Sequence, residues 1–163
     1  MVPISFPHRK PADSPAVVPS RALSRPSVAE GEISSFQLGK VRTPLVLVVD
    51  DELLIRWSLN EGLARAGFQV VEAGDARSAL ERFGPGMASI NAVVLDLRLP
   101  DSSDLGLLKR LRELAPDVPV IMMTAYGAAE TRDEALLLGA RQVVSKPFDV
   151  NRVVGLVAEA LRG

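Results

Sequence analysis

The sequence predicts an α/β fold, a doubly wound five-stranded parallel sheet with helices on both faces. Strand-like and helix-like segments alternate from Pro44 to the C-terminus, which is the pattern of such sheets. The apolar run Ala92–Leu95 is uninterrupted and leads into Asp96, which indicates a strand buried on both faces. Because crossovers between parallel strands are right-handed, we expect the strand order 2-1-3-4-5.

The elements follow one another as short apolar runs and periodic segments. The predicted strands span residues 45–49, 68–73, 91–95, 118–123 and 142–145. The predicted helices span about 55–66, 76–83, 105–114, 129–138 and 150–161. The first helix carries an apolar stripe at Ile55, Leu59, Leu63 and Ala66 and ends at Gly67.

Local signals delimit the other helices. Asp75 can cap the second helix, and the stretch Gly84-Pro85-Gly86 ends it. Pro116 and Gly139 follow the third and fourth helices, and the last helix is amphipathic. These stops make an alternation of five strands and five helices the simplest interpretation of residues 44–163.

Residues 1–43 differ from the rest of the chain in composition and in hydrophobic pattern. They contain six prolines among serine, arginine and alanine residues and show no apolar periodicity. We therefore expect a disordered N-terminal extension, followed by one folded domain at residues 44–163. No output domain is expected after the fifth helix.

Composition excludes several classes of chemistry and partner. The chain has no cysteine, and its single histidine, His8, lies in the extension. This excludes thiolate zinc sites and Ser-His-Asp catalysis from the folded part. A net charge of −1 without a basic cluster argues against nucleic-acid binding by the domain itself. Without a membrane span or a signal peptide, we expect a cytoplasmic protein with no membrane partner.

Polar residues stand where the predicted strands end. Asp50 and Asp51 follow the first strand, Asp96 ends the third, Thr124 the fourth and Lys146 the fifth. These side chains converge because parallel strands end at one edge of the sheet. Three adjacent carboxylates require a cation such as Mg²⁺, and Asp96 can then attack phosphorus to give an aspartyl phosphate. Individually, each residue is also compatible with a purely structural role as a helix cap, strand end or surface charge.

Several motifs together resemble the receiver domain of bacterial two-component response regulators. They are Val48-Val49-Asp50-Asp51-Glu52, Asp96-Leu97-Arg98-Leu99-Pro100, Thr124-Ala125-Tyr126-Gly127, Gly139-Ala140 and Lys146-Pro147-Phe148. The third motif is similar to receivers of sigma-54 activators. The resemblance implies the flavodoxin-like receiver fold.

The resemblance also implies a role for each site residue. Asp96 would accept phosphate from a histidine kinase or phosphotransfer protein. Asp50, Asp51 and Asp96 would hold Mg²⁺ together with the backbone carbonyl of Arg98. Thr124 would bind the phosphoryl group, Lys146 would pair with it, and the Lys146–Pro147 peptide is commonly cis in the family.

Two positions depart from the family pattern. Val143 stands where receivers usually carry a tyrosine or phenylalanine that moves with the threonine, and Ser103-Asp104 replaces a usual Asp-Gly pair. The first change puts the output mechanism in question, whereas the second concerns a loop.

We therefore expect a single-domain response regulator that is not an enzyme and signals to a downstream protein. Arg98 stands where a phosphatase of the haloacid dehalogenase type needs an acid, and no Gly-x-x-x-x-Gly-Lys motif follows the first strand. A partner-binding module that works without phosphorylation and a fragment of a DNA-binding regulator are the alternatives.

Two residues are candidates for partner contacts. Trp57 lies about 160° around the first helix from Ile55 and is expected to face solvent near the kinase-docking surface. Leu137 is expected to be exposed on the fourth helix and to serve output or self-association. The face formed by residues 129–138, 142–145 and 150–161 is a candidate surface for a dimer.

Overall fold

The computed structural model describes residues 42–163, apart from residue 103 and residues 126–128. Its five parallel strands lie in the order β2-β1-β3-β4-β5. They are β1 (Leu45–Val49), β2 (Gln69–Ala73), β3 (Ala92–Asp96), β4 (Val120–Thr124) and β5 (Gln142–Ser145). The predicted fold class and strand order are confirmed.

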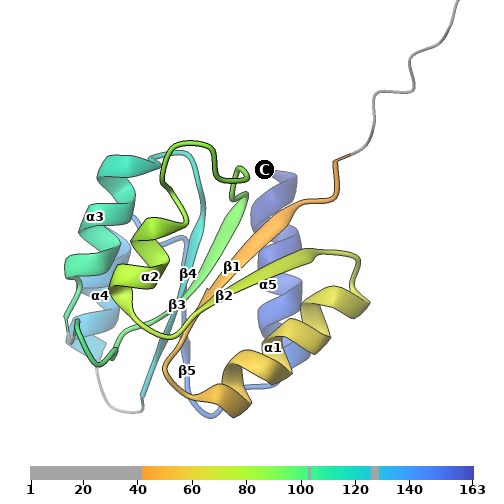
Figure 1. Ribbon diagram of the computed structural model, residues 1–163. Coiled ribbons are helices and arrows are strands. Elements are labelled where there is room, and N and C mark those ends of the chain that lie inside the picture. Colours follow the sequence, from red (N-terminus) through yellow and green to blue (C-terminus); the bar gives the residue numbers. More distant parts are fainter. Residues whose placement is uncertain (1–41, 103, 126–128) are drawn as a thin grey trace, which may run out of the picture. The chain divides into compact units, whose positions relative to one another are not determined.

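Five helices connect the strands and cover both faces of the sheet. They are α1 (Leu53–Arg65), α2 (Ala76–Glu81), α3 (Gly106–Leu114), α4 (Ala129–Leu137) and α5 (Val150–Arg162). Helices α1 and α5 lie on one face, and α2, α3 and α4 lie on the other (Figure 1). The three central strands, β1, β3 and β4, are enclosed by helices and are apolar up to or through their last residue, whereas the edge strands β2 and β5 also contain polar residues.

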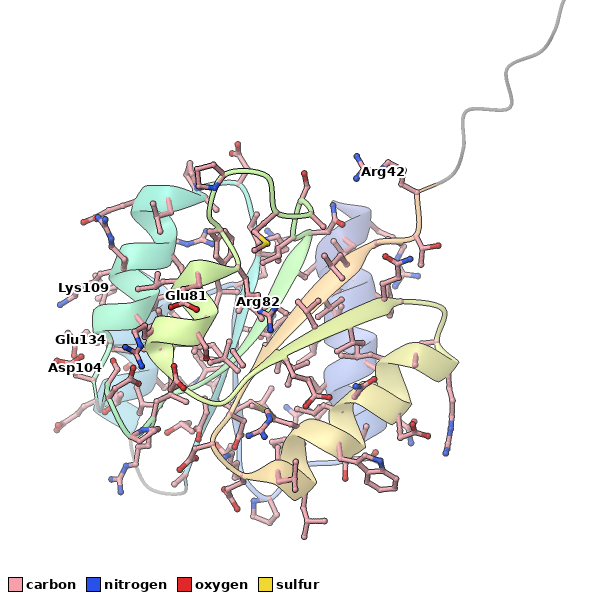
Figure 2. All side chains as sticks on the ribbon, in the orientation of Figure 1. Arg42, Glu81, Arg82, Asp104, Lys109 and Glu134 are labelled. Atoms are coloured by element: carbon pink, nitrogen blue, oxygen red, sulfur yellow. The ribbon has the colours of Figure 1, made fainter. Side chains whose placement is uncertain are left out.

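The side chains of each strand alternate between two hydrophobic cores. Val46 and Val48 of β1 pack in the core that contains Leu59 of α1 and Val153 of α5. Leu47 of β1 belongs to the other core, beside residues of α2, α3 and α4. The outer surface of α3 is charged, and its Lys109 points away from the sheet in Figure 2. Because successive side chains of a strand point to opposite faces of the sheet, each strand contributes to both cores.

The predicted ends of the elements differ from the observed ends by a few residues. The largest consequence concerns Ala66, which was predicted on the buried stripe of the first helix but is exposed. Helix α1 ends at Arg65, and Gly67 follows with φ of +91°. The Phe68 N–H bonds to the Leu63 carbonyl at 3.1 Å, which closes the helix as a Schellman motif and turns Ala66 outward.

Two expectations concern parts of the chain beyond the described fold. The predicted extension falls almost wholly in residues 1–41, which lie outside the described residues, so its boundary at 43 stays a prediction. Within the described residues, every helix is too short or too polar to cross a membrane.

Helices α1 and α5 approach each other closely at Gly62. A Cβ atom added there would lie 2.5 Å from Val150 Cγ1 and 3.3 Å from Val154 Cγ2. Gly155 of α5 offers a contrast, because a Cβ atom there would meet no heavy atom within 4 Å. Alanine substitutions at these two glycines therefore separate the effect of close packing on stability from the effect of helix propensity.

We predict that Gly62→Ala lowers the free energy of unfolding by about 1–2 kcal/mol, because overpacking outweighs the propensity gain of alanine. Gly155→Ala should raise it by about 0.5–1 kcal/mol, since only the propensity term applies. Urea unfolding of the two variants measures both changes. A stabilised Gly62→Ala protein would contradict the close packing of α1 against α5.

Asp101, in the loop after β3, caps a helix that is distant in sequence. Its carboxylate accepts the N–H groups of Ala76 at 2.7 Å and Arg77 at 3.0 Å, at the start of α2. The hydrogen bond from Ala76 is the main cause that lowers the pKa of Asp101 below its ordinary value. The loop that follows Asp96 is thereby tied to α2.

A lowered pKa in the folded state means that ionised Asp101 stabilises the fold. This contribution should be present above about pH 4, the ordinary pKa of an unfolded aspartate, and lost as the pH falls through the lower folded-state value. We predict that Asp101→Asn is less stable than the native protein at pH 7 and that the difference shrinks at pH 3. Denaturant unfolding at both pH values measures it, and an undiminished difference at pH 3 would show that the charge is irrelevant.

Candidate functional site

The Lys146 ammonium lies among three carboxylates at the edge where the parallel strands end. Its Nζ atom is 2.9 Å from Asp50 Oδ2, 3.0 Å from Asp96 Oδ2 and 3.2 Å from Glu52 Oε1. Asp50 follows β1, Asp96 ends β3, and Lys146 follows β5, so three separate strands contribute. This edge is the lower one in Figure 1. The predicted convergence of Asp50, Asp96 and Lys146 is therefore observed in the geometry.

Asp50 is the most enclosed of these groups. It is 0% exposed, its Oδ1 accepts the Glu52 N–H at 2.8 Å, and its own N–H donates to the Ala73 carbonyl at 3.1 Å. Its Oδ2 is in ionic contact with Lys146, but among the described residues no donor is aligned for a hydrogen bond with it. A buried carboxylate oxygen with spare acceptor capacity is a fitting ligand for a cation.

Asp51 completes a cluster of carboxylates. Oxygen atoms of Asp50, Asp51 and Asp96 all lie within 4.8 Å of one another, and Asp51 is exposed to solvent. One ammonium cannot balance three carboxylates, so the edge keeps an excess of negative charge. Hard oxygen ligands with this charge fit a divalent cation such as Mg²⁺, which retains waters on its open side.

Burial and neighbouring charges shift the protonation of the central pair. The pKa of Asp96 is raised, mainly because burial disfavours its charged form, while its hydrogen bond with Lys146 acts in the opposite direction. Burial also acts to lower the pKa of Lys146, but its contacts with Asp50 and Asp96 outweigh burial and raise it. Lys146 is consequently a fixed positive charge at neutral pH.

Thr124 lies at the same edge, but its hydroxyl is directed at a main-chain carbonyl. It is buried at the end of β4, next to β3, and its hydroxyl donates to the Ala125 carbonyl at 3.1 Å. Of the motif quoted for this region, Tyr126 and Gly127 lie outside the described residues. The hydroxyl would have to rotate to reach a group bound to Asp96.

Other predicted residues occupy the surroundings. Arg98 is exposed after β3, and its role as a carbonyl ligand stays a prediction. Val143 is buried in the core beneath α2, α3 and α4. Asp104 accepts the Gly106 N–H at the start of α3, while Ser103 lies outside the described residues. The Lys146–Pro147 peptide is cis.

Sequence reasoning missed a polar network behind the carboxylates. Arg56 donates to the main-chain carbonyl of Asp50 at 2.6 Å and forms an ion pair with Glu72, which also accepts from Asn60. The available signal was Glu72 itself, a charged residue that follows Val70 and Val71 within strand β2.

Comparison with known proteins places this geometry in a family. The family model described as response regulator receiver domain matches residues 46–158. The chain belongs to this family. Regulatory protein AtoC of Escherichia coli strain K12 is 38% identical to the receiver domain over 117 residues, which are 72% of this chain and 25% of AtoC.

Further relatives agree with the assignment. The DNA-binding transcriptional regulator NtrC of Rhizobium meliloti is 34% identical over 116 residues, which are 71% of this chain and 24% of NtrC. The crystal structure of the receiver domain of NtrX from Brucella abortus matches with a TM-score of 0.66 at 34% identity, over 72% of this chain and 98% of that one. This chain thus spans about a quarter of AtoC and of NtrC, and nearly all of the NtrX receiver domain.

Proposed function

We propose that this receiver domain accepts a phosphoryl group on Asp96 from a histidine kinase or phosphotransfer protein, in a Mg²⁺-dependent reaction, and signals through protein contacts. The observation that carries the proposal is the position of Lys146 Nζ, 3.0 Å from Asp96 Oδ2 and 2.9 Å from Asp50 Oδ2. A fixed cation beside a reactive carboxylate can balance the charge of a transferring phosphoryl group.

The reaction forms one bond and breaks another. A carboxylate oxygen of Asp96 attacks phosphorus, the bond from phosphorus to the donor's imidazole nitrogen breaks, and that nitrogen keeps the electron pair. Lys146 balances charge on the phosphoryl oxygens, and Thr124 donates to one of them after its hydroxyl leaves the Ala125 carbonyl. Bound Mg²⁺ would add positive charge at the same oxygens, held by Asp50, Asp51, Asp96 and the carbonyl of Arg98.

Two alternatives differ in what the site does. Lys146 already links Asp50 and Asp96, which would also suit a module that binds partners without being phosphorylated. Output through a DNA-binding segment is the other alternative, since this chain spans only about a quarter of the DNA-binding regulator NtrC. Chemical labelling decides the first alternative directly.

We predict that the protein gains one phosphoryl group when it is incubated with acetyl phosphate and Mg²⁺, because the groups that stabilise the transfer surround Asp96. Asp96→Asn should gain none, and Asp51→Ala should be labelled at least about tenfold more slowly, because an anionic ligand is missing. Intact-mass spectrometry follows the base-labile mass increase over time.

Glu113→Gln is the matched control, because it removes an exposed carboxylate from the last turn of α3, at the opposite edge of the sheet. It should be labelled at the native rate. An unlabelled native protein would favour the phosphorylation-independent module, and labelling of Asp96→Asn would refute the choice of acceptor.

An apolar groove beside the site suggests where the kinase binds. The groove has a volume of about 470 Å³, and Leu54, Ile55, Pro147 and Phe148 line it together with Lys146. The exposed side chain of Leu54 lies on α1, where Trp57 is also exposed, at 76% and 59% respectively. A surface this apolar would suit the helices of a kinase that brings its phosphohistidine to Asp96.

We predict that Trp57→Ala slows phosphoryl transfer from the cognate kinase about tenfold or more, because exposed aromatic residues often dominate protein interfaces. Labelling by acetyl phosphate should be unaffected, since Trp57 is not part of the acceptor site. Transfer from radiolabelled kinase measures the first rate. Equal transfer rates for the native protein and Trp57→Ala would remove Trp57 from the docking surface.

Leu137 provides the control for that experiment. It is 88% exposed, and its helix α4 covers the sheet face opposite α1. Leu137→Ala should leave transfer unchanged. We propose that the surface formed by α4, β5 and α5, at the β5 edge of the sheet, serves output or dimer formation, with Val143 in place of an aromatic switch residue.

A further inference from the structure

A partly buried arginine holds the main chain between the two neighbouring carboxylates of the site. The Arg56 side chain is 17% exposed, and its Nη1 donates to the Asp50 carbonyl at 2.6 Å. That carbonyl belongs to the peptide that joins Asp50 to Asp51. A hydrogen bond from a guanidinium to this oxygen fixes the plane of the peptide and therefore the direction in which the Asp51 side chain leaves the chain.

Residues of α1 and β2 in turn hold the guanidinium. Arg56 Nε is 3.4 Å from Glu72 Oε2, and Asn60 Nδ2 donates to Glu72 Oε1 at 2.5 Å. Arg82, at the end of α2 and labelled in Figure 2, donates to the Glu72 main-chain carbonyl at 3.3 Å. Both carboxylate oxygens of Glu72 are thus engaged, and a continuous set of hydrogen bonds runs from Asn60 through Glu72 and Arg56 to Asp50.

We propose that Arg56 is a positioning residue for the cation ligands and that Glu72 and Asn60 hold it in place. The proposal rests on the proposed function, in which Asp50 and Asp51 bind Mg²⁺. Asp51 is exposed, and within the described part of the chain no hydrogen bond or ion pair to another residue orients its carboxylate. Its position therefore depends on the main chain, and Arg56 is the side chain that bonds to this peptide.

Charge and position predict opposite effects when Arg56 is replaced. A guanidinium repels a nearby divalent cation, so its removal should tighten Mg²⁺ binding if only charge mattered. Its removal should weaken binding if it positions the ligands, because partners that orient metal ligands typically contribute about tenfold or more to affinity. The sign of the change separates the two roles.

The experiment measures Mg²⁺ affinity of the native chain and its variants by isothermal titration calorimetry. Arg56→Gln should bind Mg²⁺ about tenfold more weakly. Arg56→Lys keeps the charge but loses the forked geometry, so it should also bind more weakly than the native protein. The rate of labelling by acetyl phosphate should fall in the same order.

Arg112→Gln is the matched control. Arg112 also donates to main-chain carbonyls, those of Pro116 and Val118, but at the end of the sheet opposite the carboxylates. It should lose stability as Arg56→Gln does and keep native Mg²⁺ affinity. An equal loss of affinity in both variants would assign Arg56 a purely structural role and overturn the proposal.

The remaining outcomes are also decisive. Unchanged or tighter Mg²⁺ binding by Arg56→Gln would overturn the positioning role. The proposed function would still stand in that case, provided that the native protein binds Mg²⁺ and is labelled by acetyl phosphate. A native protein that bound no Mg²⁺ would instead refute the cation site itself, and the positioning role with it. If Arg56→Gln does not fold, Asn60→Ala carries the test, with about threefold weaker binding expected and native affinity as the contradicting result.

Discussion

The contacts of one ammonium with the carboxylates of Asp50 and Asp96 determine what this edge of the sheet can do. Burying either carboxylate alone would cost several kcal/mol, and Lys146 offsets part of that cost for both. The compensation is incomplete, because Asp51 adds a third carboxylate and Glu72 already engages the nearby Arg56. The domain therefore keeps an excess of negative charge that favours a divalent cation, beside a carboxylate whose raised pKa reflects its burial.

The strand order is what allows one lysine to make these contacts. In the order β2-β1-β3-β4-β5, β3 lies between the strands that precede Asp50 and Lys146, and it ends in Asp96. The two cores hold that order in place, because each strand contributes side chains to both. The site thus depends on helix packing on both faces of the sheet, although none of its charged groups belongs to a helix interior.

Most of the fold and the main convergence at the site could be predicted, because strands buried on both faces are continuous apolar runs and glycine or proline residues end the helices. The rest depends on contacts that no local pattern encodes. Arg56 and Glu72 are 16 residues apart and meet only through the packing of α1 against β2, and Asp101 reaches α2 across 25 residues. The hydrogen bond that the Thr124 hydroxyl makes depends on the rotation of one side chain, which the sequence does not specify.

Helix α1 joins three tasks through its geometry. Successive residues of a helix are rotated by about 100° around its axis, so neighbouring side chains point in different directions. Leu59 and Leu63 enter the core. Arg56 turns toward the Asp50 carbonyl, and Trp57 faces solvent. Arg56 and Trp57 are adjacent in sequence, which means that a partner seated on the outer face of α1 contacts the same helical turn that holds the Asp50 peptide. Any displacement of that turn would move the cation ligands along with the proposed docking surface, because the Arg56 guanidinium bonds both to the Asp50 carbonyl after β1 and to Glu72 of β2.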